Sequence, residues 1–316
     1  MSELRIFYQE NNRLKISKTL DTLKKIEMTD IIWVDLNDTS DAIETELEQF
    51  MKIYIQEDEE MEEIEMSSRF IQTEDSIVAN TNFILDSFVL EPVSFILKNG
   101  TLVSVRDSEL RSFNETIKKI YANAKSFPSG HHVLVTLLET RVEYDADMLE
   151  DLADQITVLS KTLNNTEADL DHSILIQIKD MQEKVMIIRQ SVMDKQRMVS
   201  NLLKSNVFPD DLLQRLTMVI KDINSLFEYI RFGFDRLDYL QDTFLGLINL
   251  QQSKIIKIFT VLTVIFMPPT LIASVYGMNF DFIPEFHWKL GYPFSIGLMV
   301  LFSGVLLFYF RKKKWL

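Results

Sequence analysis

Hydrophobic positions change character along the chain, and the first pattern is one of short runs. Up to about residue 130, apolar runs rich in β-branched and aromatic residues alternate with acidic segments of longer period. Asn99-Gly100 separates two such runs, which predicts a tight hairpin turn. We therefore expect an α/β domain over 1–130, bounded by Ser129-Gly130. The predicted strands are 31–36, 83–85, 93–97 and 101–105, and the predicted helices are 39–67 and 107–125.

Long helices are predicted from residue 131 onward. The segment 131–208 carries apolar residues at helical spacing, interrupted at Asn164-Asn165. Phe208-Pro209 ends it, and no further proline occurs until Pro268. The pattern therefore predicts a stalk helix over 209–254 that continues into the next segment, on the order of 90 Å long at the usual helical rise.

Two strongly apolar segments follow, at 255–276 and 292–310. Each is close to the ~20 residues that cross the hydrocarbon core of a membrane. We expect two transmembrane helices joined by a loop over 277–291, which is too short to form a domain. A buried helical hairpin of a soluble protein is the alternative interpretation.

Charges flanking these segments predict their orientation. Lys254 and Lys257 precede the first segment, and the basic tail 311–316 follows the second. The connecting loop carries Asp281 and Glu285 against a single lysine. The excess of basic residues on the cytoplasmic side of membrane proteins then places both termini in the cytoplasm.

Composition narrows the function classes. The net charge of −14 lies mostly before residue 250, which argues against nucleic acid as a partner. There is no cysteine, so disulfides, thiolate metal sites and cysteine nucleophiles are excluded. The first residues lack the apolar core of a signal peptide. No phosphate-binding loop and no catalytic constellation is recognisable, so we expect neither an enzyme nor a bound cofactor.

The first apolar segment carries a stripe of hydroxyl and apolar residues at alternating spacings of three and four. Such a stripe packs against another helix, or it lines a water-filled pore that a symmetric ring of copies encloses. Within it, Met267, and Ile256 with Phe259, are candidate hydrophobic constrictions. Pro268-Pro269 should kink or locally unwind the helix. The candidate pore-lining residues are Ser253, Ile256, Phe259, Thr260, Thr263, Met267, Thr270 and Ser274.

A set of short motifs surrounds the end of this segment. The motifs, in order, are Met267-Pro268-Pro269-Thr270-Leu271, Tyr276-Gly277-Met278-Asn279-Phe280, Ile283-Pro284-Glu285, Gly291-Tyr292-Pro293 and Lys314-Trp315-Leu316. This set resembles the CorA magnesium transporter family, whose signature is Gly277-Met278-Asn279. The resemblance rests on specific motifs over 249–316 and on the architecture alone elsewhere.

The resemblance implies a funnel-shaped homopentamer in the bacterial inner membrane, with signature loops ringed at its outer mouth. Its implied function is Mg²⁺ influx down the membrane potential, with Co²⁺ and Ni²⁺ as further candidate ions. Its implied partners are Mg²⁺, membrane lipid and other copies of the chain. Related zinc transporters share the signature, so transport of Zn²⁺ is one alternative, and a non-conducting membrane-anchored scaffold is another.

The signature also has a physical rationale. Mg²⁺ gives up its water reluctantly, so a ring of Asn279 carbonyl groups suits an ion that keeps its first hydration shell. Gly277 permits the backbone geometry that turns the chain out of the helix. The alternative to a selectivity motif is an ordinary helix-capping glycine followed by an asparagine in a turn. Asp281 and Glu285 either concentrate cations at the mouth or are ordinary loop acids. Ser253 stands where the family has asparagine.

Two acidic runs, at 57–65 and 139–154, are expected to be solvated helix faces or part of a metal sensor. In the family, intracellular Mg²⁺ bridges carboxylates between neighbouring cytoplasmic domains and favours the closed state. Asp86 is the candidate ligand for that regulatory ion, without an assigned partner. His131 and His132 are expected at the surface rather than in a zinc site.

Overall fold

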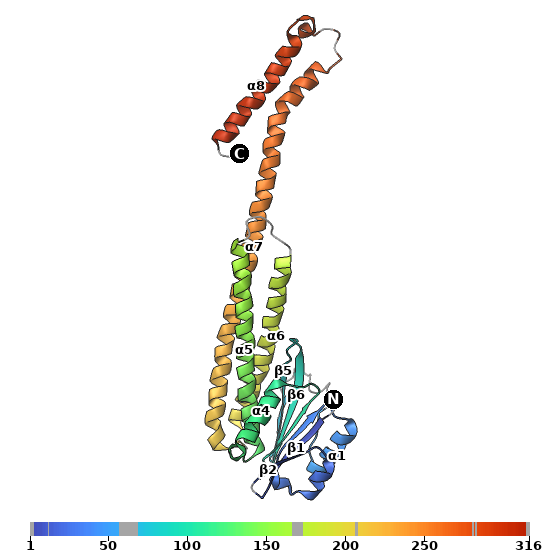
Figure 1. Ribbon diagram of the computed structural model, residues 1–316, viewed down its shortest axis with the longest axis vertical. Coiled ribbons are helices and arrows are strands. Elements are labelled where there is room, and N and C mark those ends of the chain that lie inside the picture. Colours follow the sequence, from blue (N-terminus) through green and yellow to red (C-terminus); the bar gives the residue numbers. More distant parts are fainter. Residues whose placement is uncertain are drawn as a thin grey trace. The chain divides into compact units, whose positions relative to one another are not determined.

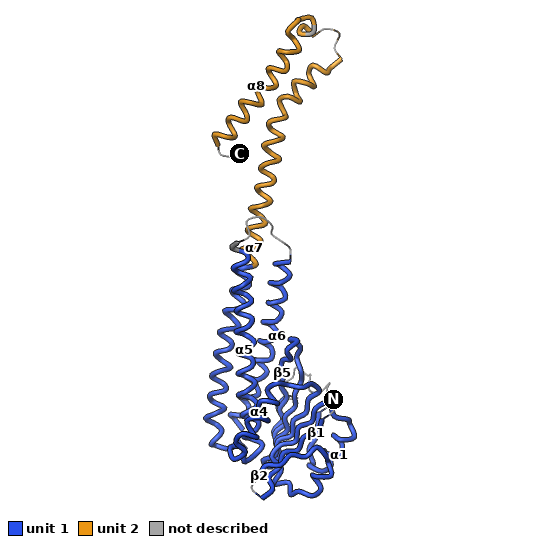
Figure 2. Tube along the Cα trace, viewed as in Figure 1, with its two compact units in different colours: residues 1–167, 171–240 blue, residues 168–170, 241–316 orange. Residues whose placement is uncertain are grey.

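The computed structural model describes residues 3–11, 13–56, 69–165, 173–205, 208–279, 281 and 283–313. The acidic run 57–65, Phe280 and Lys314-Trp315-Leu316 lie outside the described residues. The chain divides into two compact units (Figure 2): Met1–Glu167 with Asp171–Leu240, and Ala168–Leu170 with Gln241–Leu316.

The described part of the first unit contains a seven-stranded sheet in the order β2-β1-β3-β7-β6-β5-β4. β3 and β7 are parallel, and the other neighbours are antiparallel. The predicted strands correspond to β3, β5, β6 and β7, whereas β1, β2 and β4 were missed. The strands are β1 (Glu3–Glu10), β2 (Arg13–Ser17), β3 (Ile31–Asn37), β4 (Phe70–Gln72), β5 (Ser76–Ile84), β6 (Leu90–Lys98) and β7 (Thr101–Arg106).

The turn between β6 and β7 is the predicted hairpin. Asn99 has φ 50° and Gly100 has φ 85°, and Lys98 pairs with Thr101. Two successive positive φ angles match the twist of the flanking strands, which is why Asn-Gly is favoured here. The hairpin prediction is confirmed.

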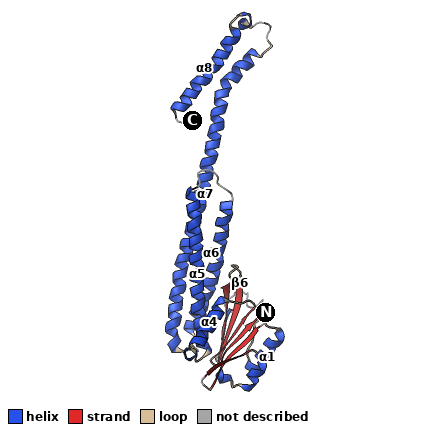
Figure 3. Ribbon diagram, viewed as in Figure 1, coloured by secondary structure: helices blue, strands red, loops and turns tan. Residues whose placement is uncertain are grey.

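Helices cover both faces of the sheet (Figures 1 and 3). On one face, Leu47 of α1 packs into a cluster with Ile6 and Val34. On the other, Trp33 stacks on Phe7 at 4.6 Å between ring centroids. Alternate residues of each strand point to opposite faces, so the helices on each side of the sheet cover one half of the side chains of the central strands. The short helices are α1 (Asp41–Met51), α4 (Arg111–Ala122) and the 3₁₀ turns η1 (Leu20–Lys25), η2 (Met28–Asp30), η3 (Ala124–Ser126) and η4 (Pro284–His287).

Three long helices follow: α5 (Gly130–Asn165), α6 (Ser173–Lys204) and α7 (Asp210–Tyr276). The predicted boundary at Ser129-Gly130 coincides with the start of α5 but is not a linker. The Gly130 amide donates to the Gly100 carbonyl at 2.6 Å, and a Cβ on Gly130 would lie 2.2 Å from the Leu102 nitrogen. Because α5 also packs on β7 and α6 on β5, the sheet, α5, α6 and the part of α7 up to Leu240 belong to one compact unit.

A buried ionic cluster joins α5, α6 and β5. Asp145 and Lys195 are both fully buried, with 3.0 Å between Asp145 Oδ2 and Lys195 Nζ. Arg141 Nε donates to Asp145 Oδ1 at 2.9 Å, and its Nη1 donates to the Ile84 carbonyl at 2.8 Å. Burial lowers the pKa of Lys195 to about 8. The expectation of a solvated face or metal sensor is therefore wrong for Asp145, because α6 packs over it and brings in a lysine.

The second unit contains the C-terminal part of α7, η4 and α8 (Gly291–Lys312). α7 and α8 each contain an 18-residue segment of mean hydropathy 2.0. Only 6% of this segment is buried in α7 and 11% in α8. The core helix of a soluble protein would be mostly buried, so the buried-hairpin alternative is wrong. Exposed apolar surface over this length needs a lipid environment.

Candidate functional site

The predicted pore-lining stripe lies on α7 within the second unit, and all of its residues are exposed. Ile256 is 58% exposed and Met267 61%. α8 contacts a different side of α7, since Ser303 Oγ donates to the Ile265 carbonyl at 3.1 Å. Val261, one turn before Ile265, is only 2% exposed. At roughly 100° per residue, this contact lies on the far side of the helix from the stripe. The stripe therefore does not pack on the chain's own second span.

Hydroxyl groups of the stripe are held by their own helix. Thr260 Oγ1 donates to the Ile256 carbonyl at 2.8 Å, and Thr270 Oγ1 donates to the Phe266 carbonyl at 2.8 Å. Thr263 makes the same contact with the carbonyl four residues before it. These bonds satisfy each donor and leave the hydroxyl oxygen able to accept a second hydrogen bond. The stripe thus offers acceptors, which suits the water molecules of a hydrated cation.

The two prolines do not unwind α7, which is helical through Pro268 and Pro269 to Tyr276. Figure 1 shows this part of the helix bent. Proline has no amide proton, so Pro269 cannot donate to the Ile265 carbonyl four residues before it. The Ser303 hydroxyl of α8 donates to that same carbonyl. Of the two predicted outcomes, a kink or a local unwinding, the bend agrees with the kink, whereas the unwinding is wrong because α7 stays helical. The hydroxyl of the neighbouring helix supplies the missing donor.

The signature residues directly follow the end of α7 at Tyr276. The Gly277 amide donates to the Ala273 carbonyl at 2.9 Å and the Met278 amide to the Val275 carbonyl at 3.3 Å. Gly277 does not have a positive φ, so the expected reason for this glycine is wrong. A Cβ there would lie 3.1 Å from the Ala273 oxygen, and glycine is favoured by that close approach. Asn279 is exposed immediately beyond the helix end.

The two predicted mouth acids differ in their surroundings. Asp281 is exposed, whereas Glu285 is half-buried and lines a groove of ≈ 330 Å³ together with Met278 and Leu298. The backbone of Glu285 also lies close to α8, since a Cβ on Gly291 would lie 2.2 Å from the Glu285 carbonyl oxygen. Asp281 is therefore the better placed of the two to act on ions in solution.

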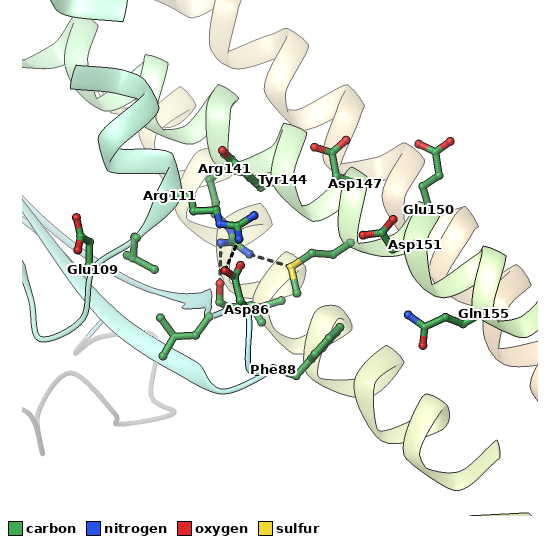
Figure 4. Close-up of a pocket in the computed structure, with 14 residues that line it drawn as sticks. Asp86, Phe88, Glu109, Arg111, Arg141, Tyr144, Asp147, Glu150, Asp151 and Gln155 are labelled. Atoms are coloured by element: carbon green, nitrogen blue, oxygen red, sulfur yellow. Dashed lines mark hydrogen bonds and ion pairs between the residues drawn. The ribbon is translucent and has the colours of Figure 1, made fainter. Parts of the chain in front are cut away.

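Asp86 lies in a separate groove of ≈ 600 Å³ in the first unit (Figure 4). Its carboxylate is 2.8 Å from Arg111 Nη2, and both side chains are largely exposed, at 70% and 68%. Acids of α5 line the same groove. They belong to the acidic run 139–154, and the packing of α5 on the sheet brings them to the groove that also holds Asp86. They are Asp147, Glu150 and Asp151.

No group of three or more His, Cys, Asp or Glu within the described ranges could hold a metal ion. The predicted surface position is wrong for His131, which is 7% exposed and lies edge-on to Phe208 with 5.1 Å between ring centroids. Burial lowers the pKa of His131. His132 is mostly covered as well, and its Nε2 is 3.2 Å from Asp211 Oδ2. The start of α5 packs against the start of α7 through these side chains.

The fold and the exposed stripe define a membrane protein with two C-terminal spans and a large polar domain. The chain belongs to the family described as CorA-like Mg²⁺ transporter protein, which matches residues 29–312. The resemblance predicted from the signature motifs is thereby confirmed, and the family is one of transporters.

Individual relatives agree over nearly the whole chain. The magnesium transport protein CorA of Wolinella succinogenes is 40% identical over 296 residues, covering 91% of this chain and 92% of that protein. The protein of the same name from Campylobacter jejuni is 34% identical, covering 99% and 100%. The complete structure of the CorA magnesium transporter from Methanocaldococcus jannaschii matches with a TM-score of 0.83 at 19% identity, covering 100% of this chain and 99% of that one. The structural match supports the predicted fold.

Proposed function

We propose that this chain is the subunit of a channel that conducts Mg²⁺ into the cell along the membrane potential. The observation that carries the proposal is the polar stripe of α7, which is exposed, is not covered by α8 and ends at Gly277-Met278-Asn279. Relatives named for magnesium transport match over nearly the full chain, which supports Mg²⁺ as the ion. The membrane potential supplies roughly 4.6 kcal/mol per 100 mV for a divalent cation moving inward.

A conducting pore requires several copies, because one helix cannot enclose a water-filled path. We infer a homopentamer with α7 innermost. Within the first unit, α7 exposes large side chains on one face, among them Tyr229 at 68%, Phe232 at 65% and Tyr239 at 69%. Their spacings of three and seven place them on one stripe. Exposed aromatic side chains of this kind support contact with other copies.

In this assembly the Asn279 side chains form the outer ring and accept hydrogen bonds from the water around Mg²⁺. Asp281 raises the local concentration of cations. Met267, and Ile256 with Phe259, narrow the path and gate it by dewetting. Ser253 lies at the inner end of the path, where the family has an asparagine. Its side chain is shorter, so it reaches less far toward the hydrated ion.

Regulation is proposed to act through Asp86. Intracellular Mg²⁺ binds there together with carboxylates of a neighbouring copy and favours the closed state, so loss of the ion shifts the population toward the open state. Arg111 neutralises Asp86 when the ion is absent. This arrangement requires both termini in the cytoplasm, which agrees with the basic residues flanking the two spans, and the inner membrane of a bacterium as the location.

Ion flux into liposomes containing the purified full-length protein tests the proposal. Under an inward-negative potential we expect uptake of Mg²⁺ and of Co²⁺. Asn279→Ala should lower Mg²⁺ uptake by more than about ten-fold, since each copy loses a hydrogen-bond acceptor for the hydrated ion. Lys289→Gln, in the same loop, is the matched control and should retain uptake.

Each outcome decides between the candidate functions. No uptake of Mg²⁺, Co²⁺ or Zn²⁺ by the wild-type protein would refute a channel and favour a scaffold. Uptake of Zn²⁺ without Mg²⁺ would favour the zinc alternative. Unchanged uptake by Asn279→Ala would refute the assigned selectivity ring while leaving conduction in place.

A further inference from the structure

Basic residues gather at one end of the two membrane helices. Lys254 and Lys257 lie on α7, and Arg311, Lys312 and Lys313 lie at the end of α8. The sequence contains no acidic residue between Asp242 and Asp281 and none after Glu285. This end of the second unit therefore carries positive charge without nearby acids along the chain, in contrast to the acidic first unit.

The contact between the helices places these cations at a similar depth. Ser303 Oγ meets the Ile265 carbonyl, which fixes the level of α8 against α7. From Ile265 to Lys254 the helix descends about 16 Å, and from Ser303 to Arg311 the antiparallel α8 descends about 12 Å. The two groups of cations thus lie within about one helical turn of the same level.

Four of these cations are exposed and form no ion pair in the part of the chain that the structure describes. Lys254, Arg311, Lys312 and Lys313 are all exposed, and none of the four forms an ion pair among the described residues. Tyr309, one position before the buried Phe310, is 54% exposed. Tyrosine is enriched where a span leaves the hydrocarbon core, so this level corresponds to the lipid headgroups.

We propose that Lys254, Arg311, Lys312 and Lys313 form a binding site for the phosphate group of an anionic phospholipid. The guanidinium fork of Arg311 matches a phosphate, and the lysines add point charges around it. Apolar side chains next to the cations, Leu307 at 44% and Phe308 at 71% exposure, give acyl chains a surface that a free phosphate ion does not use. A lipid fits both parts of this surface, so we commit to a lipid as the occupant.

Competition between lipids tests the site. The full-length protein in detergent is mixed with equimolar phosphatidylglycerol and phosphatidylcholine of the same acyl chains, and bound lipid is counted by native mass spectrometry. We expect phosphatidylglycerol to be retained preferentially. Each cation removed should lower that preference about five-fold, so Lys254→Gln lowers it and the combined Arg311→Gln, Lys312→Gln and Lys313→Gln variant nearly abolishes it.

Lys289→Gln is the matched control, since it removes one positive charge from the loop at the other end of the spans. Its preference should equal that of the wild-type protein. The proposal is overturned if the combined variant keeps the wild-type preference, or if the control loses it to the same extent.

Two measurements on the wild-type protein remain decisive should the combined variant not fold. Raising the salt concentration should weaken retention of phosphatidylglycerol, because exposed charges are screened; retention that is independent of salt overturns the proposal. Inorganic phosphate at the lipid's concentration should not displace phosphatidylglycerol, and full displacement would identify a soluble anion site instead. Neither result depends on Mg²⁺ uptake, so failure of the proposed channel function is distinguishable from failure of this site.

Discussion

The hydrogen bond between Ser303 and the Ile265 carbonyl predicts a specific coupling between two residues of the membrane helices. Pro269 removes the amide that would normally donate to this carbonyl, and Ser303 Oγ donates to it at 3.1 Å. Ser303→Ala leaves the carbonyl without a donor in apolar surroundings. The loss should destabilise the protein by about 1–2 kcal/mol, the upper part of the range for hydrogen bonds between membrane helices.

Restoring the backbone donor should remove most of this effect. In a Pro269→Ala background, the amide of residue 269 can donate to the Ile265 carbonyl, so Ser303→Ala should then cost less than about 0.5 kcal/mol. The double-mutant cycle therefore predicts a coupling energy of about 1 kcal/mol. The free energy of unfolding is measured by titrating the full-length protein in mixed micelles with sodium dodecyl sulfate and following helix content by circular dichroism.

Ser295→Ala is the control for this cycle. Ser295 Oγ donates to the Tyr292 carbonyl at 2.9 Å within the first turn of α8, away from Pro269. Its effect should be the same in both backgrounds. If Ser303→Ala lowers the free energy of unfolding equally in the two backgrounds, the assignment of Ser303 as the replacement donor is refuted.

Three further predictions concern the first unit. Asp145→Asn leaves two buried cations without their counter-charge and should destabilise by about 3–5 kcal/mol in urea unfolding, whereas the exposed Asp147→Asn should change little. Because burial lowers the pKa of Lys195 to about 8, the folded state binds fewer protons than the unfolded state between that pH and the usual lysine value of about 10.4. The free energy of unfolding contributed by this group should therefore rise with pH across that window, and Lys195→Met should abolish the rise. Arg111→Ala frees Asp86 from its counter-ion and should lower the internal Mg²⁺ concentration that half-inhibits flux by about two- to five-fold, a small effect because the pair is exposed. Unchanged inhibition in Asp86→Asn would remove Asp86 from the regulatory site.

Local signals in the sequence predicted most of the architecture. The two spans follow from uninterrupted apolar length, and the β6–β7 hairpin follows from Asn99-Gly100. The length of α7 follows from the absence of proline before Pro268. The family follows from ordered motifs around Gly277-Met278-Asn279. Each of these features depends on residues close together in the chain, so no knowledge of distant contacts was needed.

Contacts between distant segments were not predictable in the same way. β1 pairs with β3, more than twenty residues further along the chain, as well as with its neighbour β2. β2 and β4 pair with strands close in the sequence, but both are short edge strands with weak apolar patterns. Asp145 sits within an acidic run, and only α6 makes it a buried ion. The sequence around His131 is typical of a surface turn, and its burial depends on Phe208, which packs against the imidazole ring.

The same limit applies to the candidate sites. The sequence alone determined which residues form the stripe, because helical spacing is a local property. Only the tertiary structure decided that α8 leaves the stripe uncovered, that Ser303 replaces the donor lost at Pro269, and that acids of α5 line the same groove as Asp86. These facts depend on which surfaces of separate helices meet, and a periodic pattern specifies a face of a helix without specifying its partner.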